Sequence, residues 1–199
     1  QVSKFLSRFD GAKAPGGSAA NAIHSLAKMG VDTSFIFATG DDVNGHFFEE
    51  SMQSVGVKPT AFHFEKSVTG VVNALISKDG ERTFATFLGA SNEIPVETLD
   101  IEMFKGWKYC FIEGYLIASQ GVFLKSIELA KEAGCKIAFD MSSYNVVNAN
   151  RELLDSLLPL FDIVFANEDE AISFTSTSPE ESLDYIASKC KVAVVKLGK

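Results

Sequence analysis

Two neighbouring glycines and an asparagine stand at the start of a predicted helix. Gly16 and Gly17 precede Ser18, which we expect to cap a helix that Gly30 ends, and Asn21 falls in its first turn. The first N–H groups of a helix lack partners within it and carry partial positive charge. Because glycine has no β-carbon, a polar ligand can lie against this backbone, where Asn21 can donate to and accept from a hydroxyl. The pattern therefore indicates a site for a hydroxyl-bearing small molecule, although a tight turn alone would explain a glycine pair.

A second group of polar residues follows a predicted buried strand. Asn167 is positioned to cap the next helix, and Glu168, Asp169 and Glu170 complement the dipole of that helix. Capping alone accounts for this composition. However, Asn167 also lies where a parallel sheet would end, and such sheets place their ligands at that edge.

Together the two patterns resemble the pfkB, or ribokinase-like, family of carbohydrate kinases. The first signature of the family is a Gly-Gly-x-x-x-Asn turn, matched by Gly16, Gly17 and Asn21, and a later Asn-x-x-Glu motif is matched by Asn167 and Glu170. The resemblance implies that the first three residues hold the hydroxyls of a sugar or a ribose. It also implies that Asn167 and Glu170 lie near the nucleotide phosphates, with Glu170 acting on Mg²⁺ through water.

The resemblance covers about residues 15–198, is closest to adenosine kinases, and implies an enzyme. It would be a transferase that uses ATP and Mg²⁺ to phosphorylate a hydroxymethyl group of an adenosine-like nucleoside or of a sugar. Two details favour the nucleoside: the segment GYLIAS, in which Tyr115 or Leu116 could flank a flat base, and the adenosine-kinase-like run LLPLFDIVFANEDEAISF. The alternatives are a sugar kinase of the ribokinase or fructokinase type and a non-catalytic relative that binds nucleosides or sugars.

Three predicted strands follow one another with no helix between them: 58–65, 70–77 and 82–88. They suggest a small antiparallel unit at residues 57–88, which in ribokinase-like enzymes is a lid over the substrate. On that resemblance Arg82, Phe84 and Thr86 would contact the substrate, since alternate residues share one face of a strand. An edge extension of the main sheet, with a solvent-exposed Arg82, is the simpler alternative.

The base that the reaction needs is not found in this sequence. In the family the catalytic aspartate belongs to a later Gly-Ala-Gly-Asp turn, whose glycines also form an anion hole, and no such string occurs here. Asp140, at the end of a predicted strand, is not proposed as a substitute, because the family uses that region for nucleotide contacts. The resemblance therefore predicts an internal portion of a kinase that lacks both ends and contains no catalytic residue.

The elements that must position these residues alternate in type, which is typical of an α/β domain. Buried strands are expected at 33–38, 109–113, 136–140, 162–166 and 192–197, and helices at 43–55, 119–133, 151–161, 167–175 and from 178 onward. We expect a ribokinase-like, doubly wound, mostly parallel sheet flanked by helices, with residues 1–56 and 89–199 as the core and 57–88 as the lid. Residues 1–14 suggest a fragment of helix and a linker.

Composition argues against several other classes of protein. The 199 residues are 46% hydrophobic and carry a net charge of −8, whereas nucleic-acid binding needs an excess of Lys and Arg. No apolar run approaches the roughly 20 residues of a membrane span. Cys110, Cys135 and Cys190 are expected to be buried free thiols, which fits the reducing cytoplasm. The string PGGSAAN lacks the G-x-G-x-x-G spacing of a dinucleotide-binding oxidoreductase. The family resemblance allows a monomer or a homodimer.

Overall fold

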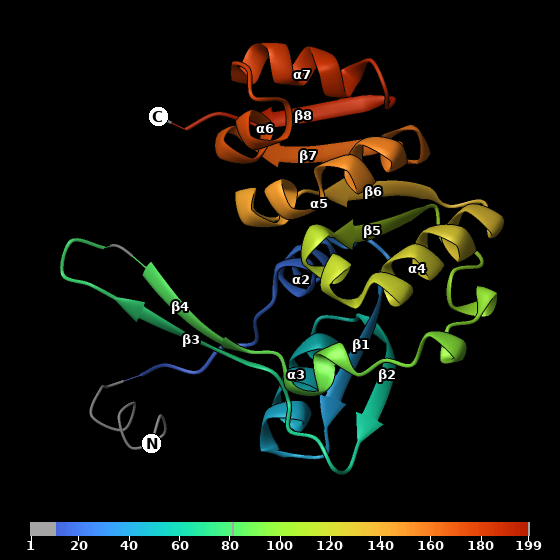
Figure 1. Cartoon of the computed structure of the whole chain (residues 1–199). Coiled ribbons are helices and arrows are strands. Elements are labelled where there is room, and N and C mark those ends of the chain that lie inside the picture. Colours follow the sequence, from blue (N-terminus) through green and yellow to red (C-terminus); the bar gives the residue numbers. More distant parts are fainter. Residues whose placement is uncertain (1–10, 81, 199) are drawn as a thin grey trace.

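The computed structural model describes residues 11–80 and 82–198, arranged as Figure 1 shows. The α-helices are α2 (Ser18–Lys28), α3 (Val43–Ser54), α4 (Gln120–Glu132), α5 (Tyr144–Leu157), α6 (Glu168–Thr175) and α7 (Pro179–Ala187). The strands are β1 (Ser34–Gly40), β2 (Lys58–Phe64), β3 (Val71–Ile76), β4 (Arg82–Phe87), β5 (Tyr109–Glu113), β6 (Lys136–Asp140), β7 (Ile163–Asn167) and β8 (Val192–Lys196). The 3₁₀ turns are η1 (Gly89–Asn92), η2 (Val96–Thr98), η3 (Ile101–Met103), η4 (Gly114–Ser119) and η5 (Leu158–Leu160). The helix fragment expected within 1–14 lies, up to residue 10, outside the described residues.

The larger sheet contains β5, β6, β7 and β8 in that order, all parallel. Consecutive strands are joined through helices, and right-handed crossovers in one direction place α4, α5 and the α6–α7 pair on the same face. Figure 1 shows α4 and α5 in front of the sheet, while α2 lies beside β5 and β1. The expected mostly parallel α/β sheet is thus confirmed. Because its strands run in one direction, their last residues form a single edge.

A second parallel sheet is formed by β1 and β2, which are joined through α3. In the described part of the chain the parallel strands thus form two hydrogen-bonded groups. One expectation is corrected: β2 belongs to the body and not to the lid expected at 57–88. The physical reason is that β1, α3 and β2 form a βαβ unit, whose crossover helix makes its strands parallel.

The antiparallel hairpin of β3 and β4 projects from the body (Figure 1), and we call residues 71–87 the arm. Its register pairs Val71 with Phe87 at the base and Ile76 with Arg82 near the tip. The connecting turn contains Gly80 with φ 88°, a conformation that favours glycine. The arm is the part of the expected lid that stands apart from the body.

The main hydrophobic core lies between the four-stranded sheet and its helices. Phe139 is fully buried at its centre, stacks on Phe161 with ring centroids 4.6 Å apart, and lies 6.0 Å from the Phe123 ring of α4. A smaller cluster, which includes Ala20 of α2 and Met52 of α3, connects α2 with the β1–β2 unit. Helix α2 therefore packs against both parts of the body.

The start of α5 differs from the expectation. The helix begins at Tyr144 rather than at 151, because the Ser143 hydroxyl accepts from the Val146 N–H at 3.3 Å and caps it. Non-helical backbone at Asn150 then divides the helix. The sequence pattern therefore identified only the second half of this helix.

The three cysteines are free, as expected. Cys135 is buried, Cys110 and Cys190 are half-buried, and burial raises the pKa of the Cys110 thiol to about 12. Among the helices of the described residues, none is long and apolar enough to cross a membrane.

Asp162 connects the sheet with two lysines. Its buried carboxylate accepts from the Ile137 N–H at 2.9 Å and from Lys191 Nζ at 2.6 Å, and Lys131 Nζ lies 3.6 Å away. Burial alone would raise the pKa of Asp162, but the bonds from Lys191 and Ile137 and the charge of Lys131 lower it below the ordinary 3.8. Such a group stabilises the fold above pH 3.8, and this stabilisation is lost as the pH falls through the lowered pKa.

The substitution D162N should lower the free energy of unfolding by about 1–3 kcal/mol at pH 7, because the charged carboxylate that accepts from Ile137 and Lys191 is lost. Urea unfolding measured over a range of pH tests this. The difference between variant and wild type should shrink as the pH falls below 3.8 towards the lowered pKa, because the wild-type carboxylate of the folded chain becomes protonated there. D184N, an exposed substitution on α7, is the control. An equal loss at every pH would contradict the ionic explanation.

Candidate active site

The last residues of β5, β6, β7 and β8 are Glu113, Asp140, Asn167 and Lys196, and we call them the strand-end row. The strand register pairs Glu113 with Asp140 and Asn167 with Lys196. Neighbouring strands are about 4.8 Å apart, so the row spans about 14 Å across the sheet. It therefore brings the two sequence patterns onto one edge of the sheet.

The N-terminus of α2 is attached to the β5 end of this row. The Ala19 N–H donates to Glu113 Oε2 at 2.9 Å, and the side chain of Ser18 also hydrogen-bonds to Glu113. The expected capping by Ser18 is wrong, because Ser18 already lies inside the helix and Gly17 occupies the N-cap position with φ 111°. Glycine adopts that conformation readily and other residues rarely do. A carboxylate 94 residues away in the sequence thus satisfies the helix N-terminus.

The residues predicted to hold substrate hydroxyls are accessible. Gly16, Gly17 and Asn21 are exposed, and a β-carbon at Gly16 would meet nothing within 4 Å. The Asn21 N–H is bonded to the Gly17 carbonyl at 2.9 Å, which leaves the amide side chain as the group that can bind a ligand. The turn therefore offers open backbone beside a donor and acceptor.

Glu113 is a site residue that the sequence interpretation missed. Its position in the sequence could have identified it, because Glu113 ends a strand directly before Gly114, as Asp140 ends the next strand. Burial raises the pKa of Glu113, while the Ala19 N–H and the Ser18 side chain oppose this and the charge of Asp140 adds to it. The carboxylate is therefore held by the helix N-terminus against the cost of burial.

Helix α6 begins with a reciprocal cap. Asn167 Oδ1 accepts from the Glu170 N–H, while the Asn167 N–H and Nδ2 donate to the two oxygens of Glu170, each at 2.8 Å. These reciprocal bonds confirm the capping interpretation, and the Glu170 side chain that makes them is only 3% exposed. Burial raises the pKa of Glu170; the Asn167 N–H and the charge of Lys196 oppose this, and Asp140 adds to it. Each carboxylate oxygen keeps a further lone pair with which it can accept from water.

Asp140 lies between the two halves of the site. Its Oδ1 accepts from the Ser142 N–H at 2.8 Å, and its Oδ2 is 3.8 Å from Lys196 Nζ. Ser142 adopts φ 66°, and its hydroxyl accepts from the Gly114 N–H at 2.7 Å. Lys196 therefore supplies positive charge next to the carboxylates of the row.

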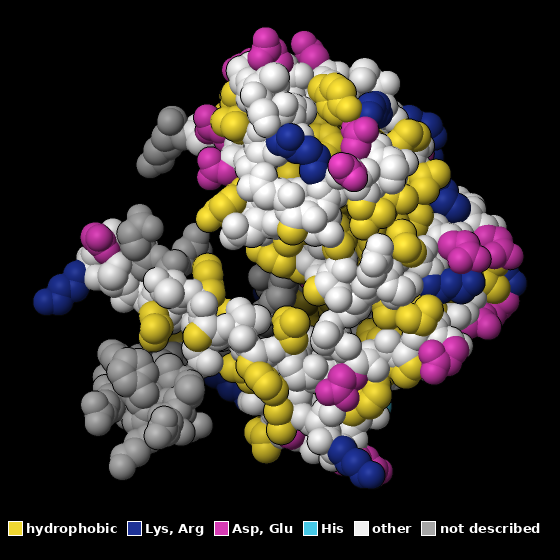
Figure 2. Space-filling model, viewed as in Figure 1, with side chains coloured by type: hydrophobic (Ala, Val, Ile, Leu, Met, Phe, Trp, Pro, Cys, Tyr) yellow, Lys and Arg dark blue, Asp and Glu magenta, His cyan; other side chains and the backbone are white. Residues whose placement is uncertain are grey.

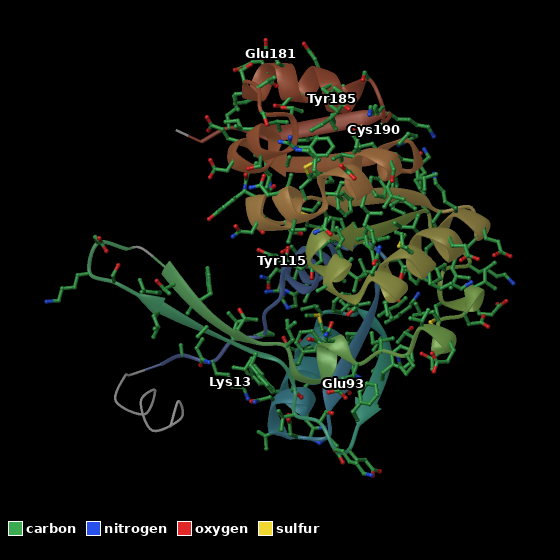
Figure 3. All side chains as sticks on the ribbon, in the orientation of Figure 1. Lys13, Glu93, Tyr115, Glu181, Tyr185 and Cys190 are labelled. Carbon is green, nitrogen blue, oxygen red and sulfur yellow. The ribbon has the colours of Figure 1, made fainter. Side chains whose placement is uncertain are left out.

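The remaining predicted substrate contacts belong to η4 and to the arm. Tyr115, labelled in Figure 3, is 51% exposed on η4 directly after β5, and Leu116 packs partly against the main core. Phe84 and Thr86 are exposed on the arm, and the side chain of Arg82 lies outside the described residues. Figure 2 shows the arm separated from the upper body by a hollow. The arm is thus open in this structure.

The donor atoms at the β6–β7 part of the row suit a magnesium ion. Mg²⁺ prefers oxygen ligands and keeps several waters, and Asp140 and Glu170 offer carboxylate oxygens. Among the residues that the structure describes, no group of three or more His, Cys, Asp or Glu side chains is arranged to hold a metal. An ion here would therefore take most of its ligands from phosphate and water.

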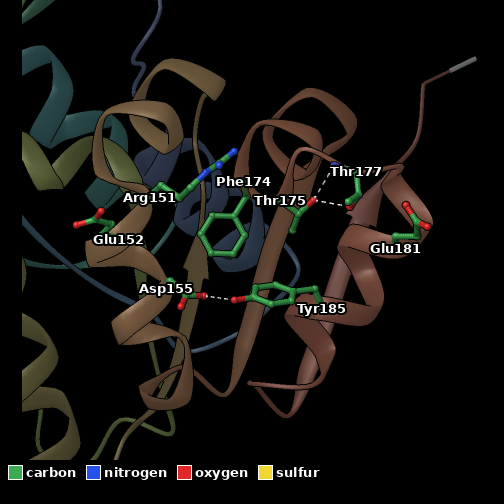
Figure 4. A pocket seen from close by; sticks show the side chains of 8 residues that line it. All are labelled: Arg151, Glu152, Asp155, Phe174, Thr175, Thr177, Glu181 and Tyr185. Atoms are coloured by element: carbon green, nitrogen blue, oxygen red, sulfur yellow. Dashed lines mark hydrogen bonds between the residues drawn. The ribbon is translucent and has the colours of Figure 1, made fainter.

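A hollow of about 530 Å³ lies elsewhere, between α5, α6 and α7 (Figure 4), and no predicted site residue lines it. Several of its polar side chains already have hydrogen-bond partners. The Tyr185 hydroxyl donates to Asp155 at 2.7 Å, and Arg151 donates to the Ser176 hydroxyl at 2.7 Å. This hollow is therefore separate from the strand-end row.

Comparison with known proteins agrees with the fold. A family model described as "pfkB family carbohydrate kinase" matches residues 8–199. Among solved structures, an adenosine kinase from Sinorhizobium meliloti is similar, with a TM-score of 0.90 and 27% identity over 99% of this chain and 63% of that one. A probable sugar kinase from Rhizobium etli has a TM-score of 0.90 and 28% identity, covering 98% of this chain and 62% of that one.

Two curated relatives match most of this chain at 24% identity. A probable fructokinase-4 of Arabidopsis thaliana is 24% identical over 200 residues, which are 94% of this chain and 61% of the relative. An aminoimidazole riboside kinase of Salmonella typhimurium is 24% identical over 196 residues, again 94% of this chain and 61% of the relative. The chain therefore spans less than two thirds of the length of these relatives.

The substitution E113Q should remove a destabilisation that grows with pH. Because the pKa of Glu113 is raised above 4.5, the folded chain binds this proton more tightly than the unfolded chain does. The contribution of Glu113 to stability is complete below pH 4.5 and is lost as the pH rises through the raised pKa. Glutamine has the same shape and can still accept from the Ala19 N–H.

Urea unfolding between about pH 4.5 and 7 should therefore show the wild type losing more stability than E113Q. E180Q, at an exposed position on α7, controls for the loss of one negative charge. Parallel stability curves for wild type and E113Q would rule out Glu113 as the origin of this pH dependence.

Proposed function

Because the chain belongs to the pfkB family of carbohydrate kinases, we propose that it forms the acceptor-binding and nucleotide-facing parts of a kinase. The enzyme would transfer a phosphoryl group from ATP to a hydroxymethyl group of an adenosine-like nucleoside or of a sugar. The observation that carries this proposal is the strand-end row. It holds the glycine turn at Glu113 and the Asn167–Glu170 cap further along the same edge.

The acceptor would bind at the β5 end of the row. The exposed backbone of Gly16 and Gly17 lies at the N-terminus of α2, whose partial positive charge favours oxygen atoms. Asn21 would orient the hydroxyls by donating to one and accepting from another. Glu113 would act through the helix, because its bond to the Ala19 N–H fixes where the turn lies.

The nucleotide would approach the β7–β8 end. Lys196 supplies a cation beside Asp140, and cations near transferring phosphates stabilise their charge. Mg²⁺, when bound, would neutralise phosphate charge, and Asn167 and Glu170 would hold its waters and the phosphate oxygens. The row spans about 14 Å across the sheet, which leaves room for a phosphate chain between the two ends. Removal of the proton from the acceptor hydroxyl is assigned to no residue of this chain.

Two acceptor classes follow from different observations. The exposed rings of Tyr115, two residues after Glu113, and of Phe84 on the arm favour a flat base and hence a nucleoside. The similarity to a probable fructokinase favours a sugar. We place the nucleoside first, because an aromatic ring would add stacking to the contacts that both acceptors share.

Calorimetric titration of the chain with adenosine, ribose and fructose tests the proposal. We expect adenosine to bind, and N21A to weaken binding about tenfold, as one lost hydrogen bond of about 1.4 kcal/mol implies. The matched control is N148A, at an exposed position on α5. Preferential binding of fructose would move the assignment to a sugar kinase. Equal affinity of wild type and N21A for every acceptor would contradict the site.

A second variant tests the nucleotide end. N167S should keep α6 stable to within about 0.5 kcal/mol, since serine is a good helix cap, but it removes the Nδ2 donor that orients Glu170. We expect weaker binding of a non-hydrolysable ATP analogue in Mg²⁺, measured by titration. S143A, which removes the cap of α5, is the control. If N167S bound the ATP analogue as tightly as the wild type, Asn167 would have no part in nucleotide binding.

A further inference from the structure

The arm joins the body through two short segments, residues 67–70 and 88–91, which we call the neck. The Ala90 N–H in the second segment donates to the Val68 carbonyl in the first at 2.9 Å. The two segments therefore form one base for the arm, beside the ends of β1 and β2.

Asp42 fastens this base to the body. Its Oδ1 caps α3 by accepting from the Asn44 and Gly45 N–H groups, both at 2.9 Å. The same oxygen accepts from the Thr69 hydroxyl at 2.8 Å, and Oδ2 accepts from the Thr69 N–H at 2.8 Å. Burial alone would raise the pKa of Asp42, but these four donors lower it. One carboxylate thus binds both a helix of the body and the entrance to the arm.

The neck is packed too closely to shift freely. Thr69 is 8% exposed, and its hydroxyl also accepts from the Gly40 N–H at 3.0 Å. A β-carbon at Gly40 would lie 2.2 Å from the Ser67 carbonyl oxygen, and one at Gly45 would lie 2.4 Å from the Gly40 oxygen. Three backbone segments therefore meet at distances that only glycine allows.

Beyond the neck the arm is exposed. Val72, Ile76 and Phe84 are 53%, 70% and 57% exposed, and Figure 1 shows the hairpin projecting from the body. A six-residue strand is about 20 Å long, so a rotation of about 10° at the neck would move the tip by about 3–4 Å. The direction of the arm is therefore sensitive to how firmly its base is held.

The chain segment that leads to the glycine turn contacts α3. Lys13 Nζ is 4.4 Å from the centre of the Phe47 ring on α3, and Gly16 follows three residues later. The helix that Asp42 caps therefore borders the approach to the acceptor turn as well as the neck.

We propose that Asp42 is a positioning residue for the acceptor site: by holding Thr69, it directs the arm so that Phe84 and Thr86 can reach a ligand at Gly16, Gly17 and Asn21. This rests on the proposed function, since it assumes an acceptor at the glycine turn. Asp42 does not touch the acceptor and acts through the orientation of the arm.

The substitution D42N separates the two tasks of this side chain. The asparagine Oδ1 keeps the cap of α3 and the bond from the Thr69 hydroxyl, but its NH₂ faces the Thr69 N–H, so two donors oppose each other. T69V removes the hydroxyl and keeps the shape, and T69S restores the hydroxyl. The matched control is D100N, since Asp100 caps η3 in the same way, by accepting from the Glu102 N–H at 2.8 Å, away from the arm.

Two measurements on the whole chain report the role. Residual dipolar couplings of the β3 and β4 amides should fit the alignment of the body in wild type, T69S and D100N, and should be reduced in D42N and T69V. If the arm then points correctly about a tenth of the time, the dissociation constant for adenosine rises about tenfold. A cap with a purely structural role would change neither quantity in the folded chain.

Unchanged couplings in D42N and T69V would overturn the proposal, and so would reduced couplings with unchanged adenosine affinity. If the wild type binds none of adenosine, ribose and fructose, the proposed function fails and the acceptor role of Asp42 fails with it. The couplings still distinguish the two failures, because they report the hold on the arm without any ligand.

Discussion

The bond between Glu113 and the N-terminus of α2 is the interaction on which the site depends. It joins the end of β5 to a helix 94 residues earlier in the chain, and it lies between the β1–β2 unit and the four-stranded sheet. A helix N-terminus has N–H groups that need acceptors, and a buried carboxylate needs donors. Each satisfies the other here, so the glycine turn has one defined position relative to the strand-end row.

The same edge concentrates charge that a protein interior usually avoids. Burial raises the pKa values of both Glu113 and Glu170, and the charge of Asp140 between them adds to each effect. Lys196, a helix N-terminus and the Asn167 cap offset this cost locally. Groups with perturbed pKa values, gathered at the ends of parallel strands, are typical of places where charged ligands bind. A phosphate chain with its magnesium ion is the kind of ligand that such an edge suits.

The body and the arm are built on different principles. The body is held by an aromatic core around Phe139, whereas the arm exposes most of its side chains and is fixed at its base. At the neck, the chain is held in place by close backbone contacts at glycines and by one carboxylate, whereas in the body a hydrophobic core holds it. The direction of the arm is therefore set at its base and not by a hydrophobic core of its own.

The sequence by itself determined the parallel strands, the glycine turn, the Asn167 cap and the family. Each of these features depends on residues close together in the chain: apolar runs, glycines and capping residues. It placed β2 in the lid and began α5 too late, since strand pairing and the cap at Ser143 depend on neighbours that spacing does not reveal. It also missed Glu113, Lys196 and Asp42. Each of these is an ordinary charged residue in the sequence, and only tertiary structure decides which donors it meets. Contacts between segments distant in the chain are set by packing and by the satisfaction of buried polar groups, and neither can be read from one stretch of residues.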